Sequence, residues 1–154
     1  MSKNLVDTFY GALAEHDGEA MAACYHENIV FEDPAFGVLT GKDAGDMWRM
    51  LCATDTDLTV THTVLEATPT TATTNWIATY TFTTTGRPVR NDVTARMTIL
   101  DDKIVDHRDT FDFWKWSSQA LGTTGKLLGW SPFLKAKVRT TTRQSLDKYQ
   151  ADNS

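Results

Sequence analysis

The stretch Val89-Arg90-Asn91-Asp92-Val93-Thr94-Ala95-Arg96-Met97-Thr98-Ile99 alternates between a mostly apolar face and a polar one. Successive side chains of a β-strand point to opposite sides, so this period of two predicts a strand with one buried face. Residues 58–64, 75–82 and 105–113 alternate in the same way. Turn formers separate the four stretches at Thr68-Pro69, Gly86-Arg87-Pro88 and Asp101-Asp102. We therefore expect a four-stranded antiparallel meander.

The sequence before residue 57 has the period of a helix instead. Apolar residues recur at helical spacing over residues 3–16 and again over 19–25. Asp43 is a plausible N-cap for a third helix, whose apolar side is formed by Met47, Trp48, Leu51 and Cys52. Helices followed by a meander indicate an α+β fold with the helices on one face of the sheet.

Beyond the meander, residues 122–132 are rich in turn formers, and a helical tail follows. Its apolar stripe consists of Leu134, Val138, Leu146 and Tyr149. Its other side is basic, with Lys135, Lys137, Arg139 and Arg143. We interpret these charges as a solvated face, the alternative being a binding patch for an anionic partner.

Size and composition fit one globular domain, since the chain has 154 residues, 41% of them hydrophobic and 23% charged. The net charge of −5 argues against a general affinity for nucleic acid. No apolar run approaches the roughly 18 residues needed to span a bilayer, and residues 1–7 lack the apolar core of a signal peptide. Cys24 and Cys52 have no metal-ligand spacing and are expected to be reduced packing residues. We expect a cytoplasmic protein.

The segment Ile29-Val30-Phe31-Glu32-Asp33-Pro34 predicts another strand and puts a carboxylate on an apolar face. Ile29, Phe31 and Asp33 share one side of the strand, and Pro34 ends its pairing. An acid held against apolar walls has a raised pKa and can accept a proton near neutral pH. Asp before Pro is also common turn chemistry, so Asp33 is either a turn cap or a functional acid.

Other polar residues fall on the apolar faces of the meander, namely His62, Asn91, His107 and Asp109. Burying a polar group without a partner costs on the order of a few kcal/mol, so each should be paired, wet or functional. His107 and Asp109 lie two apart on one strand face and can share a proton. A satisfied core histidine is the alternative for both histidines. A metal site at His107 and Asp109 is a third option, which no ligand spacing supports.

Several common chemistries have no motif in this chain. It contains no Gly-x-Gly-x-x-Gly, no P-loop and no Gly-x-Ser-x-Gly, and neither cysteine has an activating context. We expect neither a cofactor nor a metal. The aromatic residues suggest an apolar pocket instead, with plain core as the alternative. The expected wall and ligand-binding residues are Trp48, Trp76, Tyr80, Asn91 and Phe111.

The order of these elements resembles the nuclear transport factor 2-like superfamily, which includes ketosteroid isomerase and the SnoaL-like polyketide cyclases. The resemblance rests on two N-terminal helices broken at Asp17-Gly18-Glu19-Ala20, the Ile29–Pro34 segment, a third helix and the meander. It implies a cystatin-like roll, in which a cone-shaped curved antiparallel sheet and helices enclose a cavity, often in a homodimer packed through the sheet. We expect residues 1–154 to form one SnoaL-like domain. The resemblance covers about residues 3–114, and a helical extension follows at about 115–150.

The resemblance also assigns roles to residues. Asp33 looks like the general base of ketosteroid isomerase, an enzyme that the field uses as an example of carboxylate tuning. At the positions of that enzyme's oxyanion donors this chain has Phe9 and Ala95, which cannot donate. SnoaL-like cyclases use an acid on the late strands with His and Asn nearby, which Asp109, His107 and Asn91 could supply. Limonene epoxide hydrolase, a more distant relative, uses an Asp-Arg-Asp arrangement, but Arg96 and Arg108 have the outward parity here.

We therefore predict a SnoaL-like protein that binds an apolar or aromatic small molecule. Its chemistry would be cofactor-free isomerisation, cyclisation or dehydration, with Asp33 taking a proton and His107 with Asp109 relaying or donating one. Asn91 or Tyr80 would hold a substrate oxygen. The alternative is a non-catalytic ligand-binding or protein-interaction module of the same fold. We expect a homodimer, and no nucleic acid or membrane among its partners.

Overall fold

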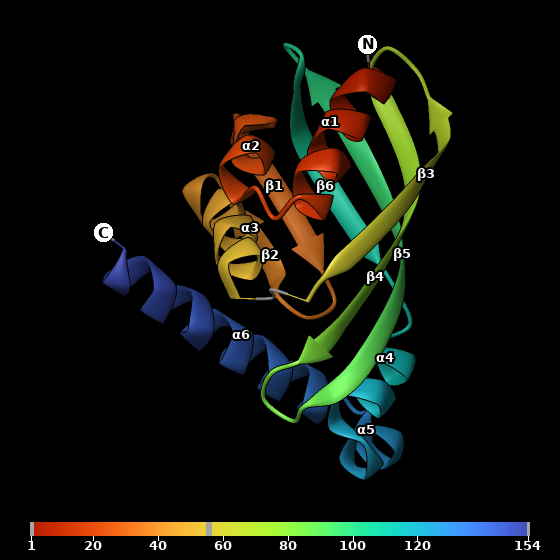
Figure 1. Ribbon diagram of the computed structural model, residues 1–154, viewed down its shortest axis with the longest axis vertical. Coiled ribbons are helices and arrows are strands. Elements are labelled where there is room, and N and C mark those ends of the chain that lie inside the picture. The colour runs from red at the N-terminus through yellow and green to blue at the C-terminus, as the bar shows by residue number, and fades with distance from the viewer. Residues whose placement is uncertain (1, 55–56, 154) are drawn as a thin grey trace.

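The computed structural model describes residues 2–54 and 57–153. Within them the chain forms six helices and one six-stranded sheet (Figure 1). The elements are α1 Ser2–Ala14, α2 Gly18–Ala23, β1 Tyr25–Asp33, β2 Gly37–Thr40, α3 Lys42–Thr54, β3 Thr59–Ala67, β4 Thr71–Phe82, β5 Arg87–Leu100, β6 Lys103–Thr110, α4 Phe113–Leu121, α5 Thr123–Leu128 and α6 Pro132–Asp152. The predicted α+β class is confirmed.

The strands are ordered β2-β1-β6-β5-β4-β3. Strands β3 to β6 are antiparallel neighbours in chain order, which confirms the meander. Strand β1 pairs in parallel with β6, and β2 folds back on β1 as an antiparallel edge strand. The sheet is curved, helices α1 to α3 lie against its concave side, and α6 runs back beneath α3 (Figure 1).

The main core lies between the sheet and the first three helices. Val93, Ala95 and Met97 of β5 are buried. Arg96 and Thr98, which flank Met97, are exposed, as the alternation predicts. Phe9 of α1 and Met47 of α3 are buried from the other side. Each such large side chain contributes roughly 1.5–3 kcal/mol through burial, so the helical and strand stripes together hold the layers.

Two predicted helix ends are wrong. The helix expected over residues 19–25 ends at Ala23, and Tyr25 begins β1 instead. The helix expected to reach His16 ends at Ala14, because His16 adopts a positive φ of 59° and its Nε2 hydrogen-bonds to the Leu58 carbonyl, 2.7 Å away. Tyr25 is buried in the core, and His16 is half-buried.

Three further local predictions need correction. The loop expected after Pro34 contains the short strand β2, bounded by Gly37 and Gly41 at positive φ, a conformation that glycine adopts without strain. Phe113 opens α4 rather than ending a strand, because Asp112 caps the helix by accepting from the Lys115 amide. Asp43 lies in the first turn of α3 and is not its N-cap.

The tail is helical, as predicted, and residues 123–128 of the expected turn-rich bridge form α5. Leu134 and Leu146 are buried, so α6 docks through its apolar stripe on the rest of the protein. Within the described ranges, no helix is both long enough and apolar enough to cross a membrane.

Candidate functional site

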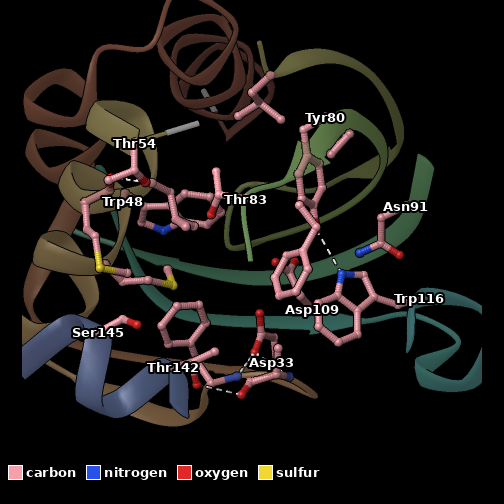
Figure 2. Close-up of a pocket in the computed structure, with 18 of the residues that line it drawn as sticks. Asp33, Trp48, Thr54, Tyr80, Thr83, Asn91, Asp109, Trp116, Thr142 and Ser145 are labelled. Atoms are coloured by element: carbon pink, nitrogen blue, oxygen red, sulfur yellow. Dashed lines mark hydrogen bonds between the residues drawn. The ribbon is translucent and has the colours of Figure 1, made fainter. Parts of the chain in front are cut away.

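A pocket of about 480 Å³ opens between α3, the concave side of β4 and β5, and α6 (Figure 2). Its walls are mostly apolar and aromatic. Of the predicted site residues, the structure places on its lining Asp33, Trp48, Trp76, Tyr80, Asn91, Asp109 and Phe111. The remaining one, His107, does not line the pocket and is completely buried behind Asp109.

Asp33 lies at the end of β1, where the strand turns away at Pro34. Its Oδ1 accepts hydrogen bonds from the amides of Ala35, at 2.9 Å, and Phe36, at 2.5 Å. The expected turn cap is therefore present. Within the described residues no group hydrogen-bonds to Oδ2, and the carboxyl group lines the pocket. Burial raises the pKa of Asp33 to about 7, with Asp109 adding to the rise, while the two amides and His107 oppose it.

Asp109 reaches the same pocket from β6. The parallel register pairs Phe31 with His107 and Glu32 with Arg108. Asp33 and Asp109 follow these pairs on the two strands, and both line the pocket. Asp109 Oδ1 accepts from His107, whose Nε2 lies 2.8 Å away, and from the Trp76 indole at 3.4 Å. The site thus holds two carboxyl groups on adjacent strands, each with one oxygen engaged by the protein.

Tyr25 completes a hydrogen-bonded chain behind Asp109. Its hydroxyl lies 2.8 Å from His107 Nδ1 and accepts from the Trp48 indole, also at 2.8 Å. An indole N–H only donates, so the Tyr25 oxygen is the acceptor there. When the Tyr25 hydroxyl in turn donates to Nδ1, the His107 proton lies on Nε2 and is donated to Asp109. Sequence reasoning missed Tyr25 because it assigned this residue to a helix.

The opposite side of the pocket carries the predicted oxygen-binding groups. The Tyr80 hydroxyl accepts from the Trp116 indole at 2.9 Å. Asn91 lies nearby on β5, and its side-chain amide makes no hydrogen bond with any described residue (Figure 2). Asn91 can therefore offer both amide donors and a carbonyl acceptor to a molecule in the pocket.

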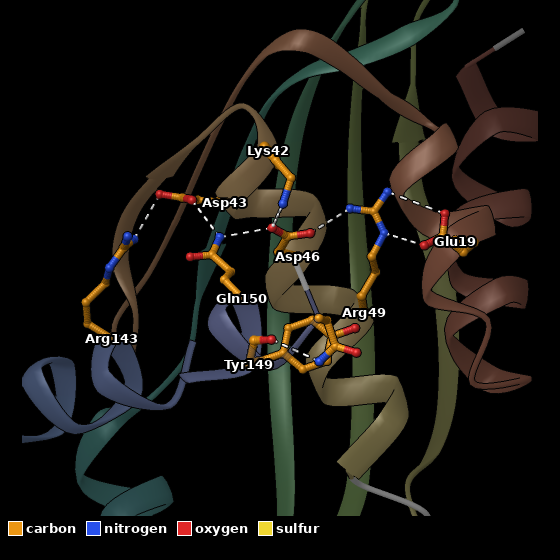
Figure 3. A network of polar contacts seen from close by, with 9 residues as sticks. Glu19, Lys42, Asp43, Asp46, Arg49, Arg143, Tyr149 and Gln150 are labelled. Carbon is orange, nitrogen blue, oxygen red and sulfur yellow. Dashed lines mark hydrogen bonds and ion pairs between the residues drawn. The ribbon is translucent and has the colours of Figure 1, made fainter. Parts of the chain in front are cut away.

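Helix α6 forms a further wall of the pocket. It contributes Thr141, Thr142, Ser145, Lys148, Tyr149 and Asp152 to the lining. Contacts with α3 hold it in place (Figure 3): Gln150 donates to Asp43 and Asp46, at 2.8 and 2.9 Å, and Arg143 pairs with Asp43 at 3.0 Å. The hydrogen bond from Gln150 is the largest effect that lowers the pKa of Asp43, and Arg143 adds to it.

His62 lies away from the pocket. It is half-buried, its Nε2 contacts Asp7 Oδ1 at 2.8 Å, and its ring stacks on Tyr10 with centroids 5.3 Å apart. This matches the interpretation of a satisfied histidine. Among the residues that the structure describes, no three His, Cys, Asp or Glu side chains are grouped so that they could hold a metal ion.

A family model described as the SnoaL-like domain matches residues 6–107. The chain belongs to this family. The match covers every strand up to the middle of β6, and it leaves α4, α5 and α6 outside. The comparison with curated proteins found no match. This SnoaL-like chain thus combines a family core with a pocket wall, α6, that lies beyond the matched segment.

Solved structures share the fold at low sequence identity. A Bacillus subtilis protein named as a candidate isomerase is 21% identical, with a TM-score of 0.65 over 78% of this chain and 92% of its own. IdmH from Streptomyces antibioticus, named as a candidate polyketide cyclase, is 20% identical, with a TM-score of 0.64 over 79% and 98%. An LEH-like epoxide hydrolase from M. tuberculosis is 18% identical, with a TM-score of 0.61 over 83% and 95%. The predicted nuclear transport factor 2-like fold is confirmed.

The structure also places the residues that the resemblance singled out. Phe9 and Ala95 are completely buried and offer no donor. Arg108 lies on the outer face of the sheet, where it pairs with Glu32 at 2.9 Å and Asp106 at 3.0 Å. It does not line the pocket, so the Asp-Arg-Asp arrangement of limonene epoxide hydrolase is not reproduced there.

Proposed function

We propose that the chain binds an apolar or aromatic small molecule in this pocket and rearranges it by acid–base catalysis without a cofactor. The observation that carries the proposal is the pair of carboxyl groups, Asp33 and Asp109, on adjacent strands in one aromatic pocket. A general acid–base group works best when its pKa lies near the operating pH. Asp33, with a pKa of about 7, meets that condition.

Asp33 is the proton-transfer group of the proposed reaction. Its free Oδ2, when ionised, takes a proton from a carbon next to a substrate carbonyl, and the C–H electron pair moves into an enolate. Returning the same proton to a different atom completes an isomerisation with no net change in composition. An aldol-type ring closure or a dehydration uses the same enolate.

The other polar groups stabilise and orient. Asn91 donates an amide hydrogen to the substrate oxygen as it gains charge. Asp109 lies beside Asp33, held by His107 and by the indole of Trp76, and it adds to the rise in the pKa of Asp33. Because Tyr25 and Trp48 hold the His107 ring in place, the second oxygen of Asp109 has a defined position in the pocket.

Hydrogen–deuterium exchange of aromatic ketones tests the proposal directly. A panel of tetralones is incubated with the protein in D₂O, and the loss of α-hydrogen signal is followed by NMR. We expect Asp33→Asn to slow the protein-dependent exchange by about 10²–10⁴-fold, and Asp109→Asn to slow it as well. Asp101→Asn is the control, because Asp101 is exposed and its positive φ of 53° suits Asn. Unchanged exchange in both pocket variants would contradict the assignment.

A pocket that binds without catalysis is the second candidate. It is favoured by Phe9 and Ala95, since the positions of the ketosteroid isomerase donors hold no donor here. Tetralones that bind, as measured by calorimetry, but exchange no faster than in buffer would support this alternative.

We also propose a cytoplasmic homodimer packed through the outer face of the sheet. Thr61, Thr63, Thr73 and Thr94 lie on that face, exposed or half-buried, and contribute hydroxyl groups to it. Cys24 and Cys52 are free and buried, as expected of a reducing compartment. A monomeric mass by light scattering at micromolar concentration would contradict the dimer.

A further inference from the structure

Five large apolar side chains are exposed together at one end of the molecule. They are Trp114 (44% exposed), Leu127 (66%), Leu128 (42%), Trp130 (73%) and Phe133 (71%), and we call them the α4–α6 patch. Figure 1 shows α4, α5 and the start of α6 gathered at the end of the molecule opposite the N-terminus. The other exposed large apolar residues in the described part of the chain, Val38, Leu65 and Leu100, belong to three different strands, β2, β3 and β5. Large apolar side chains exposed on neighbouring elements at one end of a molecule are typical of an interaction surface.

The fold holds the rings of this patch in place. The Trp114 indole donates to the Lys126 carbonyl at 3.1 Å, and the Trp130 indole donates to the Leu127 carbonyl at 2.9 Å. Ser131 caps α6 by accepting from the Phe133 amide at 3.1 Å. The indoles thus fasten α4 to α5 and α5 to the loop before α6, while their apolar surfaces remain outside.

The charge around the patch is opposite to that of the rest of the chain. Residues 113–143 contain six Lys and Arg and no Asp or Glu, so this segment has a net charge of +6. The rest of the chain has nine basic and 20 acidic side chains and a net charge of −11. Four of the six are lysines close to the patch in sequence, namely Lys115, Lys126, Lys135 and Lys137. None of the four forms an ion pair with a described residue, and the one cation–π contact among them in the described ranges is that of Lys135 Nζ over the Phe113 ring, 5.6 Å from its centroid. Their charge is therefore not neutralised by a carboxylate.

The chemistry of the patch selects its occupant. A second copy docked patch to patch would bring lysines against lysines, which is unfavourable. Nucleic acid would use the lysines but would leave Leu127, Leu128 and Phe133 without a role. A lipid surface uses both, because Trp, Leu and Phe insert at the headgroup boundary while lysines bind anionic headgroups. We propose that the α4–α6 patch docks this protein on an anionic lipid surface.

This proposal is independent of the proposed function. We expected no membrane partner because the sequence has no apolar run long enough to span a bilayer. That observation does not bear on a protein that docks at the membrane surface through the α4–α6 patch. The docking would have a geometric consequence for the pocket, since α6 begins at the patch and continues as a pocket wall.

Vesicle co-sedimentation tests the docking. The full chain is mixed with vesicles of phosphatidylcholine alone or with about one-third phosphatidylserine, at low and at physiological ionic strength. We expect binding to the anionic vesicles that weakens with salt, and a loss of about fivefold in affinity for each lysine among the four changed to Gln. Trp130→Ser with Phe133→Ser should abolish binding. The matched control is Leu65→Ser with Leu100→Ser, which removes similarly exposed apolar side chains elsewhere.

Circular dichroism shows whether each variant is folded, and light scattering gives its mass. Absent binding to anionic vesicles at low salt would overturn the proposal, as would equal binding by the patch and control variants. A dimer that becomes monomeric only in the patch variant would assign the surface to a second copy. Retention on single-stranded DNA without vesicle binding would assign it to nucleic acid.

Discussion

Removing the Tyr25 hydroxyl should destabilise the protein more than its small size suggests. In Tyr25→Phe, the Trp48 indole N–H and His107 Nδ1 both lose their partner. Trp48 is 3% exposed and His107 is fully buried, so water does not replace the hydroxyl. Each unsatisfied buried group costs about 1–3 kcal/mol. We expect a loss of about 2–5 kcal/mol in the free energy of unfolding, a large share of the roughly 5–15 kcal/mol typical of a domain.

The chain provides a matched control in Tyr10. This tyrosine is also buried, but its hydroxyl has no hydrogen-bond partner among the described residues. Tyr10→Phe removes the same atom without breaking a hydrogen bond, so we expect no loss of stability and a gain of up to about 1 kcal/mol. Urea unfolding of both variants at one protein concentration measures the difference. Equal midpoints for the two variants, or a wild-type midpoint for Tyr25→Phe, would refute the reasoning.

Three other predictions follow from contacts and charges. Folding raises the pKa of Asp33 from 3.8 to about 7, so the folded state binds more protons than the unfolded state between these pH values. Stability should therefore fall as the pH rises from about 4 to 7. In urea unfolding over this pH range, the stability of Asp33→Asn should fall by up to about 4 kcal/mol less than that of the wild type. Gln150→Ala should speed amide hydrogen exchange in α6, whereas Gln144→Ala, at an exposed position, should not. Gly125→Ala should disrupt α4 and α5, seen as a lowered Tm, because its Cβ would lie 1.9 Å from a carbonyl oxygen of α4; Gly11→Ala, with open space around it, should be tolerated.

Much of the site could be predicted because it lies on strands with one buried face. On β4 and β5, period-two alternation places Trp76, Tyr80 and Asn91 on the concave side without knowledge of the tertiary structure. Polar residues in an apolar row, such as Asp109, are conspicuous because their burial needs a physical reason. These residues were found by parity alone.

The missed features depend on contacts between residues far apart in the chain. Tyr25 begins a strand because β1 pairs with β6, about 80 residues later, and only one residue separates it from α2. The apolar stripe of α6 predicts that it docks, but not where, since Gln150 meets Asp43 across 107 residues. Local pattern carries no information about such pairings, so the hydrogen-bonded chain behind Asp109 and the contacts that hold α6 against α3 are visible only in three dimensions.

Asp33 shows that a turn cap and a functional acid need not be alternatives. Its Oδ1 accepts two backbone amides, which fixes the carboxyl group at the end of β1 and, acting alone, would hold its pKa below 3.8. The pKa is instead raised to about 7, so burial in the aromatic pocket outweighs both hydrogen bonds. A carboxyl group serving only as a turn cap at the surface would not experience that burial. The two amide hydrogen bonds therefore fix the position of the Asp33 carboxyl group, and burial in the pocket raises its pKa.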